Sequence, residues 1–169
     1  ITRDDYNSCE RFSLVELYGE NITLRNFTPG DAEKLLDYYI RNKKHLAPFE
    51  PIRDSSFFTL ENQISLLNES YKQLLNGTSI DMGIFKDDRL IGKLKLSNIV
   101  YGSLKSGILG YSIDEKEQGH GYMRESVNLF LEYAFEECNL HRIEASAMVD
   151  NEKSRNVLSK CGFKLVGIN

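Results

Sequence analysis

The sequence predicts one α/β domain of the α+β kind, with a mixed and mostly antiparallel central sheet flanked by helices. Two observations lead to this prediction. Three strand-like apolar runs follow one another at 80–85, 90–96 and 108–113, and the turn 86–88 joins the first two as a hairpin. The third run leads into a glycine-rich turn, a long helical pattern and a further alternating run, which together form a β-α-β crossover. An antiparallel meander that feeds such a crossover makes a mixed sheet.

The segments before the meander supply a strand and two helices. Residues 1–20 have weak periodicity and are expected to form a loosely held arm. The expected elements are then a strand at 22–25, a helix that begins at 28–31, a loop at 45–59 and a helix at about 60–75. Asn76-Gly77 ends the second helix, because glycine readily adopts the left-handed conformation found there.

The segments after the meander complete the crossover. The long helix follows the glycine turn and ends at about Cys138, and the next strand alternates over 142–149. Asn151 is expected to cap a short helix that runs through Lys160, and residues 162–166 open one more strand. We find no internal repeat or interdomain linker, so the whole chain of 169 residues is expected to form a single domain.

Composition and charge exclude several classes of protein. The net charge of −4 argues against general nucleic-acid binding, which needs a basic face. No apolar run approaches the roughly 20 residues that a membrane span needs, and residues 1–5 lack the apolar core of a signal peptide. We therefore expect a cytoplasmic protein with no membrane partner.

The cysteines predict neither a metal site nor a disulfide framework. Cys9, Cys138 and Cys161 are odd in number and widely spaced, and no Cys-x-x-Cys pair occurs. We expect reduced thiols, and we interpret Cys161 as a buried thiol rather than a nucleophile.

A glycine-rich turn, Gln118-Gly119-His120-Gly121-Tyr122-Met123, lies between the third run and the long helix. Its glycines let ligand oxygens approach the backbone where a Cβ would intrude. The helix that follows adds N–H groups and a partial positive charge. This arrangement predicts a binding site for a phosphorylated cofactor. His120 lies between the glycines and is expected to point along the phosphates or into solvent, with no catalytic role.

Several blocks of the sequence follow patterns that occur together in one known family. Residues 116–121, Lys-Glu-Gln-Gly-His-Gly, match a pyrophosphate loop usually written Arg/Gln-x-x-Gly-x-Gly/Ala, with Lys116 as the departure. Residues 151–154, Asn-Glu-Lys-Ser, match an Asn-x-x-Ser block, and residues 160–163, Lys-Cys-Gly-Phe, match Lys-x-Gly-Phe. From about residue 20 to its end, the chain resembles the GNAT superfamily of acetyl-CoA-dependent N-acetyltransferases.

Other blocks resemble one branch of that superfamily. His45 to Pro51 is similar to the His-Leu-x-Pro-Trp-x-Pro loop of the RimJ/RimL type, with Phe49 in place of Trp. Residues 51–54, 96–100 and 109–113 look like the ribosomal-protein-alanine N-acetyltransferases of this branch. The resemblance therefore implies an acceptor that is the N-terminal α-amine of a ribosomal protein.

The resemblance implies acetyl-CoA as the donor and assigns residues to its binding. The backbone of Gln118 to Met123 is expected to hold the pyrophosphate, and the edge at Ser112 and Ile113 to bind the pantetheine arm like an extra strand. Asn151 is expected to orient the pantetheine, to cap its helix, or both, and Ser154 to lie at the donor as well. The residues expected on the acceptor side are Phe49, Asn98 and Tyr111.

The implied chemistry is direct attack of a neutral amine on the thioester. Ser154 is the expected acid for the leaving thiolate, although its position also suits a residue that only serves the helix N-terminus. Many relatives use a tyrosine after the helix leucine as the acid, but here Ser159 follows Leu158. An α-amine, with a pKa of about 7.7–8.0, asks little of a base. Glu50 and Glu144 are the candidates for that base.

Two alternatives to this function stay open. One is the same chemistry on a polyamine, an amino acid or an aminoglycoside, and the other is a non-catalytic sensor that binds acyl-CoA. A homodimer is common among relatives. Relatives also continue past Gly162-Phe163 with a hairpin that closes the sheet. Because this sequence ends at Asn169, we expect that it is truncated rather than completed by a partner chain.

Overall fold

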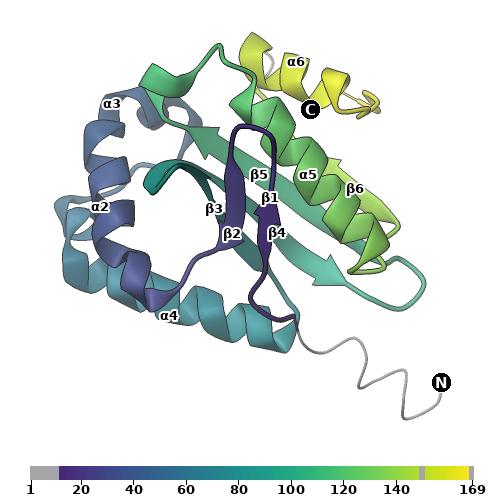
Figure 1. The fold of residues 1–169 in the computed structure, drawn as a ribbon, viewed down its shortest axis with the longest axis horizontal. Coiled ribbons are helices and arrows are strands. Elements are labelled where there is room, and N and C mark those ends of the chain that lie inside the picture. Colours follow the sequence, from purple (N-terminus) through teal and green to yellow (C-terminus); the bar gives the residue numbers. More distant parts are fainter. Residues whose placement is uncertain (1–11, 149–150, 168–169) are drawn as a thin grey trace.

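A six-stranded sheet forms the centre of the computed structural model, which describes residues 12–148 and 151–167 (Figure 1). The strands lie in the order β1-β2-β3-β4-β5-β6. Neighbouring strands from β1 to β5 are antiparallel, and β5 pairs with β6 in parallel. The expected mixed, mostly antiparallel sheet flanked by helices is confirmed.

The elements have the following bounds. The strands are β1 (Glu16–Tyr18), β2 (Thr23–Asn26), β3 (Ile80–Lys86), β4 (Arg89–Val100), β5 (Ser106–Ile113) and β6 (Arg142–Ala145). The α-helices are α2 (Ala32–Arg41), α3 (Lys43–Leu46), α4 (Leu60–Asn76), α5 (Tyr122–Glu136) and α6 (Glu152–Lys160). The 3-10 turns are η1 (Pro29–Asp31), η2 (Ala47–Phe49), η3 (Ser55–Phe58) and η4 (Glu115–Glu117). Over the described ranges, no helix combines the length and the apolar character needed to cross a membrane.

Helices cover both faces of the sheet (Figure 1), and successive side chains of β5 point alternately toward one face and the other. Tyr111 points toward α6, where it contacts Ser154, and its neighbour Ser112 points toward α2, where it contacts Tyr38. The larger core lies on the face of α5 and α6, and Phe130 of α5 is fully buried in it. The smaller core lies between the sheet, α2 and α4. The glycine turn therefore leads from β5 to the face of the larger core.

The boundaries that depend on local sequence signals agree with the predictions. The strands β3 and β5 and the helices α4 and α5 begin and end close to the expected residues, whereas β4 begins as expected but runs on to Val100 instead of ending at Leu96. Gly77 ends α4 with a left-handed φ of 74°. Asn151 caps α6, because its Oδ1 accepts the Ser154 N–H at 3.1 Å.

The structure corrects the expectation of a loose arm over residues 1–20. Residues 16–18 form β1, an edge strand that pairs with β2, while residues 1–11 lie outside the described part of the chain. A strand of three residues is too short to show a clear alternating pattern. The expected loop over 45–59 also contains the end of α3 and the turns η2 and η3.

The two expected strands near the end of the sequence also need correction. β6 ends at Ala145 and residues 146–148 are not strand, while Val149 lies outside the described residues. Residues 163–167 have no regular structure, and Leu165 and Val166 are 80% and 92% exposed. A strand needs a neighbour to pair with, and no strand of the described chain pairs with this segment.

A buried carboxylate anchors the end of β5 to α2. Asp114 directly follows β5, its side chain is 2% exposed, and it accepts a hydrogen bond from Arg41 Nε at 2.7 Å. The Lys116 N–H also donates to it at 3.0 Å, and the Glu115 N–H donates to Asn42 Oδ1 at 3.0 Å. Burial opposes ionisation of Asp114, but the hydrogen bonds from Arg41 and the backbone outweigh it and lower its pKa. The start of the turn toward α5 is thereby fixed to the end of α2.

Asp114→Asn is expected to lower the free energy of unfolding by about 1.5–3 kcal/mol at neutral pH, because it removes a charge-assisted hydrogen bond to Arg41. The lowered pKa sets the pH dependence. The stabilisation is complete above the unfolded pKa of about 3.9 and is lost as the pH falls through the lower folded value. Urea unfolding of both proteins between about pH 3 and pH 7 measures this difference.

Asp37→Asn is the matched control for that prediction. Asp37 also contacts Arg41, but its side chain is 70% exposed, so its loss is expected to cost less than about 1 kcal/mol. The account of Asp114 is wrong if the wild type and Asp114→Asn differ equally at both ends of the pH range.

Candidate functional site

The strands β5 and β6 separate partway along their length. Their pairing ends at Leu109 and Ala145, whereas β5 continues to Ile113. Within the described chain, residues 110–113 are paired with β4 alone. An unpaired strand edge offers N–H and C=O groups to an extended ligand. The predicted donor-binding residues Ser112 and Ile113 lie on this edge, which we call the open edge (residues 110–113).

The open edge leads into the glycine turn at the N-terminus of α5. Gly119 and Gly121 have φ values of 80° and 78°, a conformation that favours glycine, and a Cβ at either would meet no atom within 4 Å. The Glu125 N–H donates to Gly121 O at 3.0 Å, and the N–H groups ahead of it have no acceptor within the helix. Met123 is 6% exposed, so its side chain packs in the core and only its backbone faces the turn.

Gln118 links the glycine turn to two helices. Its Nε2 lies 3.3 Å from His45 Nε2 of α3, and its Oε1 accepts a hydrogen bond from Lys153 Nζ of α6 at 3.0 Å. Because the amide nitrogen is the donor, the first contact requires the His45 tautomer that carries its hydrogen on Nδ1. The Gln118 side chain therefore spans the space between α3 and α6 at the start of the turn.

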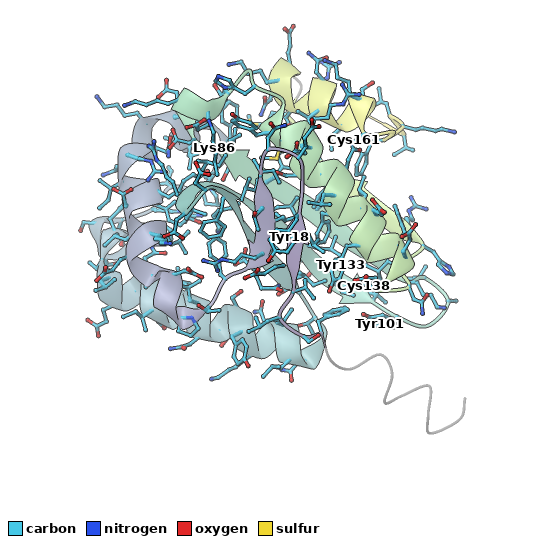
Figure 2. The ribbon with its side chains drawn as sticks, viewed as in Figure 1. Tyr18, Lys86, Tyr101, Tyr133, Cys138 and Cys161 are labelled. Atoms are coloured by element: carbon cyan, nitrogen blue, oxygen red, sulfur yellow. The ribbon has the colours of Figure 1, made fainter. Side chains whose placement is uncertain are left out.

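Two aromatic residues of the glycine turn stack on each other. The rings of His120 and Tyr122 are nearly parallel, with 5.3 Å between their centres, and His120 Nδ1 lies 3.2 Å from Glu117 O. Lys86, labelled in Figure 2, holds its ammonium 5.1 Å from the centre of the Tyr122 ring. These contacts join His120 to its own turn, and its expected lack of a catalytic role stays a prediction.

Tyr111 and Ser154 meet between the open edge and α6. Tyr111 Oη lies 2.9 Å from Ser154 Oγ and 3.1 Å from Ser154 O. The Ser154 N–H is occupied by Asn151 Oδ1, so the cap of α6 uses the backbone of Ser154 and leaves its hydroxyl for other partners. Burial raises the pKa of Tyr111, although the hydrogen bond with Ser154 opposes this effect, so the phenol is neutral at physiological pH. Two neutral hydroxyl groups therefore lie together beside the open edge.

The opposite face of β5 carries a second group of polar side chains. Ser112 Oγ lies 2.8 Å from Tyr38 Oη, and burial raises the pKa of Tyr38. Lys93 pairs with Ser112 across the sheet, and its ammonium donates to Tyr39 Oη at 2.6 Å. Burial opposes the charge of Lys93, but Asp81 and Tyr39 outweigh it and raise its pKa. The Lys93 ammonium is therefore charged at neutral pH.

Glu50 joins this group through Arg53. The carboxylate of Glu50 lies 3.4 Å from Arg53, whose guanidinium lies 5.2 Å from the centre of the Tyr39 ring. Glu50 also acts electrostatically on Lys93. We call Tyr39, Glu50, Arg53 and Lys93 the α2-face cluster. Its charged members are two cations and one carboxylate beside the open edge, and the carboxylate of Asp81 also acts electrostatically on Lys93.

Three other predicted residues lie apart from Ser154. Glu144 of β6 is 55% exposed and pairs with Arg142 at 2.8 Å. Phe49 ends η2 and is 49% exposed. Asn98 is exposed, with a φ of 50°, where the pairing of β4 with β5 is irregular. Among the described residues, none of these three forms a hydrogen bond or ion pair with Ser154.

Cys161 lies at the contact of α6 with α5 (Figure 2), where its thiol is 3.7 Å from Arg124 O. It is half-buried rather than fully buried, and burial raises the pKa of its thiol, which disfavours the reactive thiolate. In the ranges that the structure describes, His, Cys, Asp and Glu side chains form no group that could hold a metal ion.

Sequence reasoning missed several residues that the structure brings to this region. Lys93 lies in an alternating strand whose other side is apolar, so the pattern alone places it in solvent. Its proximity to Tyr39 depends on how α2 covers the sheet, which no local pattern reveals. Lys153, in contrast, lies within the Asn-x-x-Ser block of residues 151–154, so this motif could have identified it as a residue near the site.

Comparisons with known proteins agree with this arrangement. The acetyltransferase (GNAT) domain family matches residues 21–164. A protein of Bacillus subtilis named "Probable N-acetyltransferase YjcK" is 38% identical over 154 residues, which cover 90% of this chain and 85% of that protein.

Two solved structures resemble the whole fold. The ribosomal-protein-S5-alanine acetyltransferase of Vibrio fischeri has a TM-score of 0.87 and 34% identity, and the match covers 90% of this chain and 85% of that one. RimJ of Mycobacterium smegmatis, solved in complex with CoA-disulfide, has a TM-score of 0.85 and 26% identity, with 91% and 76% covered. An open strand edge, a glycine turn before α5 and a family match over most of the sequence thus agree. The chain belongs to the GNAT family of acetyl-CoA-dependent N-acetyltransferases.

Proposed function

We propose that this protein transfers the acetyl group of acetyl-CoA to the N-terminal α-amine of a ribosomal protein, by direct attack of the amine on the thioester. The charges of the α2-face cluster are the observation from which we infer the class of acceptor. Its two cations are balanced by the carboxylates of Glu50 and Asp81, so it has no excess negative charge to attract polyamines and aminoglycosides, which carry several positive charges. A peptide with a single neutral amine does not depend on such an attraction. The similarity to the Vibrio fischeri ribosomal-protein-S5-alanine acetyltransferase supports a ribosomal acceptor.

The described residues fit a bound acetyl-CoA. The open edge would pair with the pantetheine arm, and the N–H groups of the turn from Gln118 to Met123 would hold the pyrophosphate at the positive end of α5. Asn151 would act through α6, whose first turn it caps beside the pantetheine. When bound, acetyl-CoA supplies a thioester carbonyl for attack by the amine.

The acceptor amine needs only a weak base. With a pKa of about 7.7–8.0, roughly a tenth of an α-amine is already neutral at pH 7. Of the two candidate bases, Glu50 is favoured over Glu144, because Glu50 belongs to the α2-face cluster and Glu144 is exposed and paired with Arg142. Phe49 and Asn98 would contact the acceptor from the rim of this face.

Ser154 would donate a hydrogen bond to the thiolate of CoA as it leaves. A thiol has a pKa of about 8.5, so its thiolate needs no strong acid at neutral pH. A hydroxyl donor at the helix start is sufficient to stabilise the charge that develops on sulfur. The Ser154 hydroxyl takes no part in the helix cap, which uses the Ser154 N–H, and it lies in contact with Tyr111 Oη instead.

Gly121→Ala is expected to weaken acetyl-CoA binding at least about tenfold, because the new Cβ stands where phosphate oxygens approach. Isothermal titration calorimetry measures the Kd. Gly102→Ala is the matched control, since Gly102 has a φ of 77° and equally open surroundings but lies in the β4–β5 loop. The two variants should lose similar stability, and equal losses of affinity would contradict the proposed phosphate site.

Ser154→Ala is expected to lower kcat by about ten- to a hundredfold while the Kd for acetyl-CoA changes less than about twofold. Steady-state release of CoA thiol gives kcat. Ser159→Ala, an exposed serine on the same helix, is the control and should keep wild-type turnover. Wild-type turnover by Ser154→Ala at saturating substrates would remove Ser154 from the mechanism.

A screen of acceptors tests the function itself. Release of CoA is measured with N-terminal peptides of ribosomal proteins, with the same peptides blocked at the α-amine, with spermidine and with an aminoglycoside. We expect release with the free peptides, and mass spectrometry should place the acetyl group on the first residue. Faster release with spermidine would support a small-amine acceptor, and tight acetyl-CoA binding without release to any amine would indicate a sensor.

A further inference from the structure

We propose that Tyr111 is the positioning residue that holds the Ser154 hydroxyl as a hydrogen-bond donor toward the open edge of β5. This inference rests on the proposed role of Ser154. It assigns Tyr111 a function beyond contact with the acceptor, and it makes the phenol and the serine hydroxyl one unit.

The geometry places the phenol oxygen where it can do this. Tyr111 lies on the open edge itself, beyond the last residue that pairs with β6. Its side chain projects to the face of α6, while the flanking Gly110 and Ser112 belong to the opposite face. The phenol oxygen then meets both oxygens of Ser154, at 2.9 Å from Oγ and 3.1 Å from the carbonyl oxygen.

Two arrangements of the hydroxyl hydrogens satisfy these distances. In the first, Tyr111 donates to the Ser154 carbonyl oxygen, and the Ser154 hydroxyl donates to Tyr111. In the second, Tyr111 donates to Ser154 Oγ, and the Ser154 hydrogen is free to turn toward the open edge. Rotation of the two hydroxyl groups interconverts them, so charge that develops at the open edge draws the pair into the second arrangement.

The second arrangement makes Ser154 a better donor. A hydroxyl that accepts one hydrogen bond donates the next one more strongly, because a chain of hydrogen bonds polarises its members. During transfer, the amine nitrogen bonds to the thioester carbon, the C–S bond breaks, and its electron pair stays on sulfur. Ser154 donates a hydrogen bond to that sulfur and Tyr111 donates one to Ser154. The proton that CoA finally carries comes from the acceptor amine by way of solvent, so neither hydroxyl is consumed.

Tyr111→Phe tests the proposal, because it keeps the ring and removes only the hydroxyl. We expect kcat to fall about five- to tenfold, with the Kd for acetyl-CoA unchanged within about twofold. In Ser154→Ala the loss should disappear, so that Tyr111→Phe/Ser154→Ala and Ser154→Ala have equal kcat. The defect of Tyr111→Phe should also shrink with acetyl thioesters whose thiols are more acidic than CoA, since their thiolates need less stabilisation.

A second measurement needs no turnover. The ¹³Cζ resonance of Tyr111 in labelled protein, identified by its loss in Tyr111→Phe, should shift in Ser154→Ala and stay in place in Ser159→Ala. Tyr133→Phe, which removes a buried phenol from α5 in the same core, controls for the loss of a buried hydroxyl and should keep wild-type kcat.

The possible outcomes separate the two proposals. Loss of turnover in Ser154→Ala but not in Tyr111→Phe overturns the role of Tyr111 and leaves that of Ser154. Independent, multiplying losses in the double variant, or an unmoved Tyr111 resonance, also overturn it and reduce Tyr111 to an anchor for α6. Wild-type turnover in Ser154→Ala removes both roles, while CoA release by the wild-type protein tests acetyl transfer separately.

Discussion

The early separation of β5 from β6 is the constraint on which the site depends. Their pairing ends at Leu109 and Ala145, although β5 runs on to Ile113 and directly into the turn before α5. An unpaired strand edge normally invites aggregation, so it needs protection. Here the contact of Tyr111 with Ser154 lies over one face of the open edge, and that of Ser112 with Tyr38 lies over the other. Side chains therefore flank the open edge on both faces of the sheet, while its backbone has no partner strand among the described residues beyond β4.

Alternation along the open edge then separates the two halves of the proposed chemistry. Tyr111 projects toward α6 and Ser154, and Ser112 projects toward α2 and the α2-face cluster. A thioester that lies along the edge would have the hydroxyl pair on one side and Glu50, Arg53 and Lys93 on the other. Because a one-residue change of register would exchange these faces, the pairing of β4 with β5 sets the orientation of the site.

Helix ends, turns and caps that depend on a few neighbouring residues could be predicted from the sequence, and contacts that depend on tertiary packing could not. Gly77, the glycine turn and Asn151 each act through their own backbone or that of near neighbours, and the structure places each as expected. The expected strand at 162–166 was wrong, because an alternating pattern cannot show whether a partner strand lies beside it. Of the α2-face cluster only Glu50 was predicted, and its other members were missed for a related reason. Tyr39 and Lys93 are far apart in sequence, and only the way in which α2 crosses the sheet makes them neighbours.

Asn151 and Ser154 use different groups of the α6 N-terminus, which bears on the proposed role of Ser154 as a weak acid. The Asn-x-x-Ser pattern fits a helix cap as well as a catalytic serine, and the structure shows that the cap uses Asn151 Oδ1 and the Ser154 N–H. The serine hydroxyl is thereby left to Tyr111, whose raised pKa keeps it neutral and donating. A thiolate with a conjugate pKa of about 8.5 requires only hydrogen-bond stabilisation near neutral pH. A charged acid beside the open edge would add the cost of a buried ion without a corresponding need, so two neutral hydroxyls match the demand of the leaving group.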